Sequence, residues 1–221
     1  MFTDGVSQVI VPLWLLTLHP SALSFGIVIG ARSFLPIFLS IHGGVLMDRL
    51  GVRRVMLFFA LVGLALPVLY PMLPFVAVAV VLQLILGLTT TMSWVGAQTV
   101  AGQTTKGNPR FIGRLSFSNR FGAFAGPLLA GITWDTLGQW GGFGLMFFWS
   151  AMLLICALML PKDAARLATR AVTLRDTLPR FDDYARALAL LAVPAVAVVA
   201  IGSVLNIATS AVQSSFYIVY L

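Results

Sequence analysis

The stretch Gly44-Val45-Leu46-Met47-Asp48-Arg49-Leu50-Gly51-Val52-Arg53-Arg54 lies between two long apolar runs and combines four charges with two glycines. A chain that crosses a membrane must return through water between two spans, and a tight turn needs glycine where φ is positive. Asp48 is suited to accept hydrogen bonds at a helix end, and the three arginines suit a surface of anionic lipid. We therefore expect a short basic loop between two membrane-spanning helices, and a generic basic hairpin is the simpler alternative.

The composition is that of a polytopic membrane protein. Hydrophobic residues make up 59% of the chain and charged residues only 10%, and the mean hydropathy is +0.98, whereas soluble domains carry about 25% charged residues. The net charge of +7 falls in loops between apolar runs, which indicates membrane topology rather than nucleic-acid binding. The single cysteine, Cys156, excludes an intrachain disulfide, and we expect it to be a packing residue. No zinc-binding, nucleotide-binding or nucleophile motif occurs, so we expect neither an enzyme nor a cofactor.

Seven apolar runs have lengths that suit membrane helices, and a basic connector precedes the last. We expect residues 1–160 to form a six-helix bundle, residues 161–186 to form the connector, and residues 187–221 to form the first helix of a second bundle. The seven runs are Met1–Leu18, Ala22–Met47, Val55–Tyr70, Phe75–Val95, Ile112–Ile132, the run from about 143 to Leu160, and Ala187–Leu221.

The basic residues predict which side of the membrane each connection faces. They gather in the Gly44–Arg54 stretch, around Lys106 and Arg110, and in the connector, while the three alternate turns hold no Lys or Arg. Because cytoplasmic loops carry an excess of Lys and Arg, these basic segments are expected in the cytoplasm and the protein in the cell (plasma) membrane.

The spacing G-x-x-x-D-R-x-G-x-R-R resembles the signature loop between the second and third helices of the major facilitator superfamily. The matching positions are Gly44, Asp48, Arg49, Gly51, Arg53 and Arg54. The resemblance implies an all-α transporter with two six-helix bundles that rock around a central site. With seven expected helices, the chain looks like a fragment, and its expected partners are the lipid bilayer, a missing C-terminal half and a small-molecule substrate.

A second resemblance involves the fifth apolar run, where small residues follow the spacing G-x(8)-G-x(3)-G-P-x-x-x-G. It resembles the fifth-helix motif of the antiporters in this family, which implies efflux in exchange for an incoming cation such as H⁺. Ordinary packing of small residues is the alternative. The motif usually ends in two glycines, and here Ala130 replaces the first. Its residues are Gly113, Gly122, Gly126, Pro127 and Gly131.

Polar residues recur at helical spacing in three runs, and the resemblance implies that these helices line the central cavity. Hydrogen bonding between helices is the alternative. Many proton-coupled members have an arginine where Gln83 stands, four residues before Gly87, which argues against the usual proton-coupling arrangement. The stripes are Asp4, Ser7 and Gln8 in the first run, Gln83, Gly87, Thr90, Thr91 and Trp94 in the fourth, and Ser203, Asn206, Ser210 and Gln213 in the seventh.

Asp4 and Arg32 are charges inside predicted spans, and such charges are functional-site candidates. Measured along the predicted helices, Asp4 lies roughly 22 Å before the turn at His19, and Arg32 lies roughly 18 Å after that turn. Their similar depths predict an ion pair.

From these features we predict secondary active transport of a small molecule, most simply efflux by proton-coupled antiport. The alternatives are an importer of a sugar or organic acid with the same fold, and a membrane scaffold or inactive fragment that transports nothing. No metal site is expected.

Overall fold

A computed structural model describes residues 2–105, 109–160, 184–185, 189–205 and 209. The chain divides into two compact units, residues 1–178 and 179–221, and each is described by itself. Within the described residues the regular elements are helices and no strand occurs, so the predicted all-α fold is confirmed.

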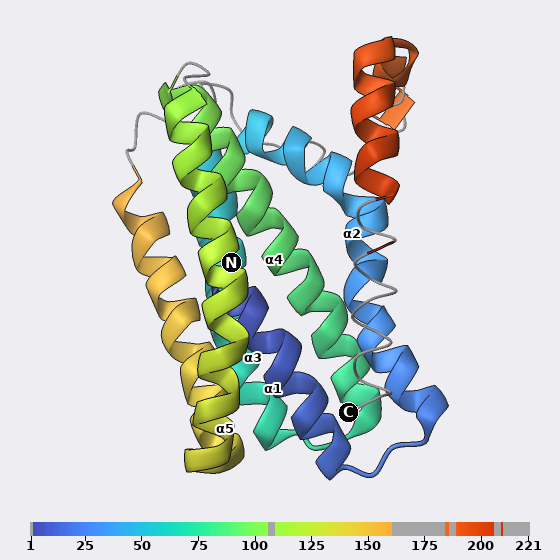
Figure 1. The fold of residues 1–221 in the computed structure, drawn as a ribbon, viewed down its shortest axis with the longest axis vertical. Coiled ribbons are helices and arrows are strands. Elements are labelled where there is room, and N and C mark those ends of the chain that lie inside the picture. Colours follow the sequence, from blue (N-terminus) through green and yellow to red (C-terminus); the bar gives the residue numbers. More distant parts are fainter. Residues whose placement is uncertain (1, 106–108, 161–183, 186–188, 206–208, 210–221) are drawn as a thin grey trace. The chain divides into compact units, whose positions relative to one another are not determined.

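The described part of the first unit contains five helices (Figure 1): α1 (Phe2–Thr17), α2 (Ala22–Leu50), α3 (Val52–Met72), α4 (Val76–Thr105) and α5 (Pro109–Met159). Of these, α2, α3, α4 and α5 are long and apolar enough to cross a membrane, while α1 has 16 residues. The main packing partners are α2 with α4, α1 with α5, and α3 with both α4 and α5.

The helix α5 contains two of the expected spans. Its backbone leaves helical geometry at Gly138, where φ is 64° and ψ is −159°. The arm before Gly138 and the arm after it run in opposite directions (Figure 1). The sequence left residues 133–142 between the fifth and sixth predicted runs, and in the structure a single residue breaks the helix there, because one glycine with positive φ is enough to reverse the chain.

The Gly44–Arg54 stretch is not the loop that the sequence predicted. Residues 44–50 continue α2, and α3 begins at Val52, so Gly51 alone separates the two helices. Gly51 adopts φ 87° and ψ 137°, and its amide still donates to the Met47 carbonyl at 3.0 Å. One residue suffices because glycine has no Cβ to exclude this backbone conformation. We call the end of the first unit where Gly51 lies the signature end.

The helix α4 also exceeds its predicted length. The sequence predicted that this span ends near Val95, but the helix continues to Thr105. Polar residues mark where a helix leaves an apolar environment and do not end it, because its backbone hydrogen bonds are made internally.

The core opposite the signature end is built around three aromatic rings from α1, α3 and the second arm of α5. Trp14 packs edge-on against Tyr70 and Phe143, with ring centroids 5.3 and 5.9 Å away, and Tyr70 stacks on Phe143 at 5.6 Å. Inside a bilayer such packing, rather than the removal of apolar surface from water, holds helices together.

In the second unit the described residues include a 3₁₀ turn, η3 (Leu190–Ala192), and a helix over Pro194–Leu205. Residues 161–183, within the predicted connector, lie outside the described residues, as does most of the last predicted run beyond Leu205. The predicted domain boundaries therefore stay predictions.

Candidate substrate and coupling site

The two charges predicted to pair inside the spans do so. The Arg32 guanidinium of α2 forms an ion pair with the Asp4 carboxylate of α1. The same guanidinium donates to Ser7 Oγ at 2.9 Å, and Gln8 Nε2 donates to the other Asp4 oxygen at 3.1 Å. The side chains of Arg32 and Asp4 remain 17% and 36% exposed, so the pair is held firmly but stays accessible.

Close contact between α2 and α4 places this pair beside the polar stripe of α4. A Cβ built on Gly87 would lie 1.7 Å from the Arg32 carbonyl oxygen, which shows that only glycine fits there. A groove of about 370 Å³ follows this contact, and Asp4 and Arg32 form part of its wall. The other lining residues are Ser33, Pro36, Ile37, Ser40, Gly87, Thr90 and Thr91.

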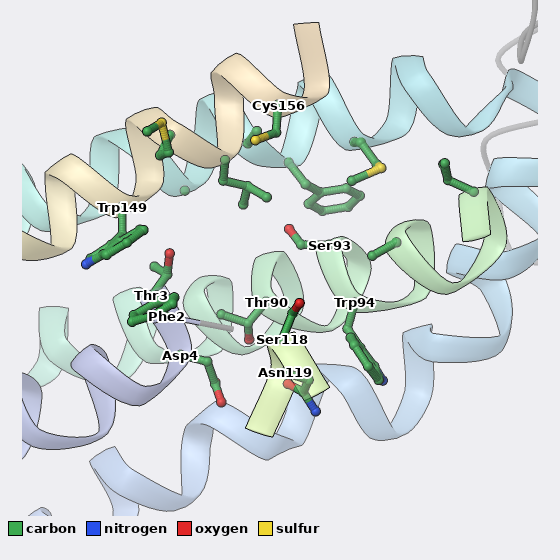
Figure 2. A pocket seen from close by; sticks show the side chains of 18 of the residues that line it. Phe2, Thr3, Asp4, Thr90, Ser93, Trp94, Ser118, Asn119, Trp149 and Cys156 are labelled. Carbon is green, nitrogen blue, oxygen red and sulfur yellow. The ribbon is translucent and has the colours of Figure 1, made fainter. Parts of the chain in front are cut away.

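A second hollow of about 730 Å³ lies on the other side of Asp4, between α1, α3, α4 and both arms of α5 (Figure 2). It extends from Phe2 and Asp4 to Met56 and Leu160 near the signature end. Its wall is mostly apolar and aromatic, and Phe2 stacks on Trp149 with ring centroids 4.2 Å apart. Its hydroxyl and amide groups include those of Thr90, Ser93, Ser118 and Asn119. Asp4 belongs to both hollows, and this is the central geometric fact of the site.

The structure assembles the predicted cavity residues only in part. Asp4 and Trp94 line the larger hollow, while Arg32 lines the groove. Gln8 acts through its bond to Asp4, and Gln83 is buried, 2% exposed, and lines neither hollow. Ser203 is exposed in the second unit and donates to the Val199 carbonyl, while Asn206, Ser210 and Gln213 lie outside the described residues.

The antiporter-like motif divides into residues that contact α1 and residues that do not. A Cβ on Gly5 would lie 3.1 Å from both the Gly122 carbonyl oxygen and Pro127 Cδ, and a Cβ on Gly126 would lie 3.2 Å from Gly5 Cα. Around Gly113 and Gly131 there is open space among the described residues. The motif therefore makes a close crossing of α1 and α5 directly beside Asp4.

The signature end contains a further contact between helices. Arg53 Nη2, in the first turn of α3, donates to the Leu158 carbonyl oxygen at the end of α5, at 3.1 Å. This bond satisfies one of the carbonyls that a helix C-terminus leaves unpaired, and it places a positive charge at the negative end of the helix dipole. Arg54 and Asp48 are exposed, Arg49 is partly buried, and Gly44 faces open space on α2.

Several residues at the site were not predicted. Gly5 lacked a signal because its partner glycines are more than 100 residues away, and Ser33 and Ser40 are isolated polar residues in an apolar helix. Cys156, predicted to be a packing residue, is exposed and lines the larger hollow, which is a correction. Within the described ranges no group of three His, Cys, Asp or Glu side chains is arranged to hold a metal.

Comparison with known proteins gives one match. The family model described as Major Facilitator Superfamily matches residues 1–220. No curated protein matches the chain. No solved structure matches it either.

Proposed function

Since the chain belongs to the major facilitator superfamily and is therefore a membrane transporter of small molecules, we propose that it exports its substrate in exchange for protons. One observation carries the proposal: the Asp4 carboxylate is paired with Arg32 and at the same time lines both hollows of the first unit. A carboxylate that reaches two compartments is suited to exchange a proton on one side and a substrate on the other.

The charge balance of the pair supplies the coupling. While Asp4 is ionised, the pair is neutral as a whole. A proton on Asp4 removes the negative charge and leaves the partly buried Arg32 without its counter-ion, which is costly in a medium of low dielectric constant. The bond that ties α1 to α2 at this point is then weakened, and the two helices are free to rearrange.

The substrate is proposed to bind where the two hollows meet. The hydroxyls of the groove and the Asp4–Arg32 pair suit a polar group, and the aromatic wall around Trp94 and Trp149 suits an apolar body. Substrate and proton then compete for the Asp4 carboxylate. Such competition favours exchange of the two across the membrane over their transport together in one direction.

Export rather than import is supported by the Gly122, Gly126 and Pro127 crossing, the part of the antiporter-like motif that packs against α1 beside Asp4. Import by symport with the same fold is the second candidate. Gln83 in place of a charged residue weakens the case for the usual proton-coupling arrangement, so our proposal assigns coupling to Asp4 instead.

The remaining expectations are parts of the same proposal. The signature end, with Asp48 as a gating residue, faces the cytoplasm of the cell membrane, and the polar stripe of the last predicted run lines a substrate cavity, as the family resemblance implies; that stripe is Ser203, Asn206, Ser210 and Gln213. The basic side chains of the signature stretch support this sidedness because cytoplasmic loops attract Lys and Arg.

Proteoliposomes that contain the protein and a trapped pH-sensitive dye test the exchange. Sugars, organic acids, amino acids and apolar amines are added outside, one at a time. If an added compound enters in exchange for protons, protons leave and the lumen becomes more alkaline. Acidification of the lumen by the same compound would instead establish symport, and unchanged responses in the Asp4→Asn variant would separate Asp4 from coupling.

A further inference from the structure

Two buried polar side-chain atoms, one on α3 and one on α4, lack hydrogen-bond partners among the described residues. Tyr70 is 0% exposed and Gln83 is 2% exposed. Neither the Tyr70 hydroxyl nor Gln83 Oε1 has a partner among the described residues. Buried polar atoms are nearly always hydrogen-bonded, to protein or to ordered water, so two unsatisfied atoms in one region of the core require an explanation.

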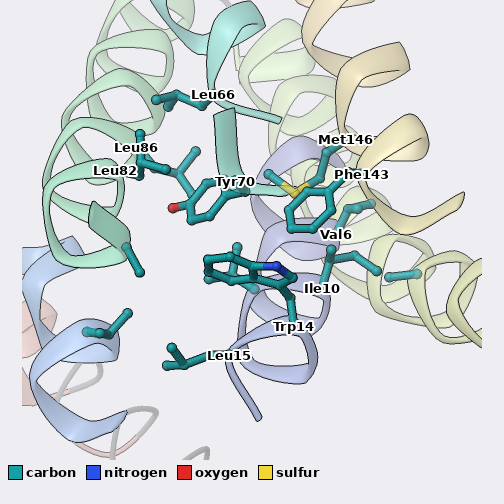
Figure 3. Packing of buried hydrophobic residues seen from close by; sticks show 14 residues of the cluster. Val6, Ile10, Trp14, Leu15, Leu66, Tyr70, Leu82, Leu86, Phe143 and Met146 are labelled. Carbon is teal, nitrogen blue, oxygen red and sulfur yellow. The ribbon is translucent and has the colours of Figure 1, made fainter. Parts of the chain in front are cut away.

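Helix geometry places these atoms in one region. Figure 3 shows the Tyr70 hydroxyl pointing toward α4, beside Leu82 and Leu86. Viewed along α4, Gln83 lies about 60° from Leu86 and about 40° from Gly87, the residue that contacts Arg32. Gln83 is therefore on the face of α4 between Tyr70 of α3 and Arg32 of α2.

We propose that Tyr70 and Gln83 bind a water molecule inside the bundle, one helical turn from the Arg32–Gly87 contact. Gln83 Oε1 only accepts hydrogen bonds, while the Tyr70 hydroxyl both donates and accepts. Water can donate to the amide oxygen and bond to the phenol at the same time, and a buried water needs two to four polar partners. A cation is disfavoured because neither Tyr70 nor Gln83 is anionic.

The water lies on the side of the pair that faces away from the signature end. Gln83 precedes Gly87 on α4, toward the helix start at Val76, and Tyr70 is two residues from the end of α3 at Met72. The water therefore adds a polar group on the side of Asp4, Ser7 and Arg32 that is nearer to the opposite end of the bundle. A role for this water in proton transfer rests on the proposed function, whereas the presence of the water site does not.

Hydroxyl-radical footprinting tests the site without a transport assay. Short X-ray pulses generate radicals from water, including bound water inside a protein, and mass spectrometry then measures oxidation at each residue. In the purified protein, Tyr70 should be oxidised several-fold faster than Phe143, after correction for intrinsic reactivity. The two rings stack on each other and both are buried, so Phe143 is a matched control.

The Gln83→Leu variant supplies the second comparison. Loss of the amide oxygen should slow Tyr70 oxidation several-fold and leave Trp14 oxidation unchanged. Equal corrected rates for Tyr70 and Phe143 in the unaltered protein would overturn the proposal, and that measurement needs no variant to fold. Equal rates of Tyr70 oxidation in the unaltered protein and in Gln83→Leu would also overturn the proposal.

Discussion

The Asp4 carboxylate of α1 is ion-paired with the Arg32 guanidinium of α2, and the two side chains come from positions 28 residues apart in the sequence. The pair joins the first two helices at the point where the groove and the larger hollow meet. Its bonds to Ser7 and Gln8 orient both charges, so the pair is part of a network on α1 rather than an isolated contact.

Breaking the pair from either side should destabilise the bundle. We expect Arg32→Gln to lower the free energy of unfolding by about 1–3 kcal/mol, because a charged hydrogen bond is lost and Asp4 stays partly buried without its counter-ion. The double change Arg32→Gln with Asp4→Asn should recover part of this loss. Thermal unfolding in detergent measures it, and Asp135→Asn is the control. Equal destabilisation by the single and double changes would contradict the pairing account.

The contact between α2 and α4 should tolerate no side chain at Gly87. A methyl group there would overlap the Arg32 carbonyl, so Gly87→Ala must push the two backbones apart and should reduce both stability and yield. Gly131→Ala is the matched control, since the space around Gly131 is open. Similar melting temperatures for the two variants would mean that α2 and α4 are not this close.

The two glycines of the signature stretch should respond in opposite directions. Gly51→Ala should cost about 1–3 kcal/mol, because φ is 87° and an L-residue is strained there. Gly44→Ala should be neutral or stabilise by up to about 1 kcal/mol, because Gly44 is helical and faces open space. Chemical unfolding in mixed micelles ranks the variants, and equal losses at both positions would contradict the one-residue junction.

The two arginines after Gly51 should also differ. Arg53→Gln removes the charged bond to the Leu158 carbonyl and should destabilise the contact between α3 and α5, while the exposed Arg54→Gln should have little effect. The readout is thiol labelling of Cys156, which lies two residues before Leu158. Labelling should be faster in Arg53→Gln than in Arg54→Gln, and equal rates would show that the bond does not hold the end of α5.

The sequence predicted features that depend on spacing along one helix, and it failed where two distant helices must meet. Counting residues from His19 was enough to predict the Asp4–Arg32 pair, because depth in a membrane follows from helical rise. The signature motif indicated that glycine is needed between α2 and α3, but it did not tell which glycine has positive φ. The groove depends on how closely α2 and α4 approach at Gly87, and the α1–α5 crossing depends on Gly5 meeting Gly126. Such contacts follow from tertiary packing, and no periodicity within a single helix reports them.

The central claim is that Asp4 takes up the proton that drives transport, and charge movement across proteoliposomes on a solid-supported membrane tests it without knowledge of the substrate. A rapid step to lower pH should produce a transient current in the unaltered protein as protons reach Asp4 inside the bundle. The account predicts that this current is lost in Asp4→Asn and kept in Asp135→Asn. A current of unchanged size in Asp4→Asn, at equal protein density, would contradict it.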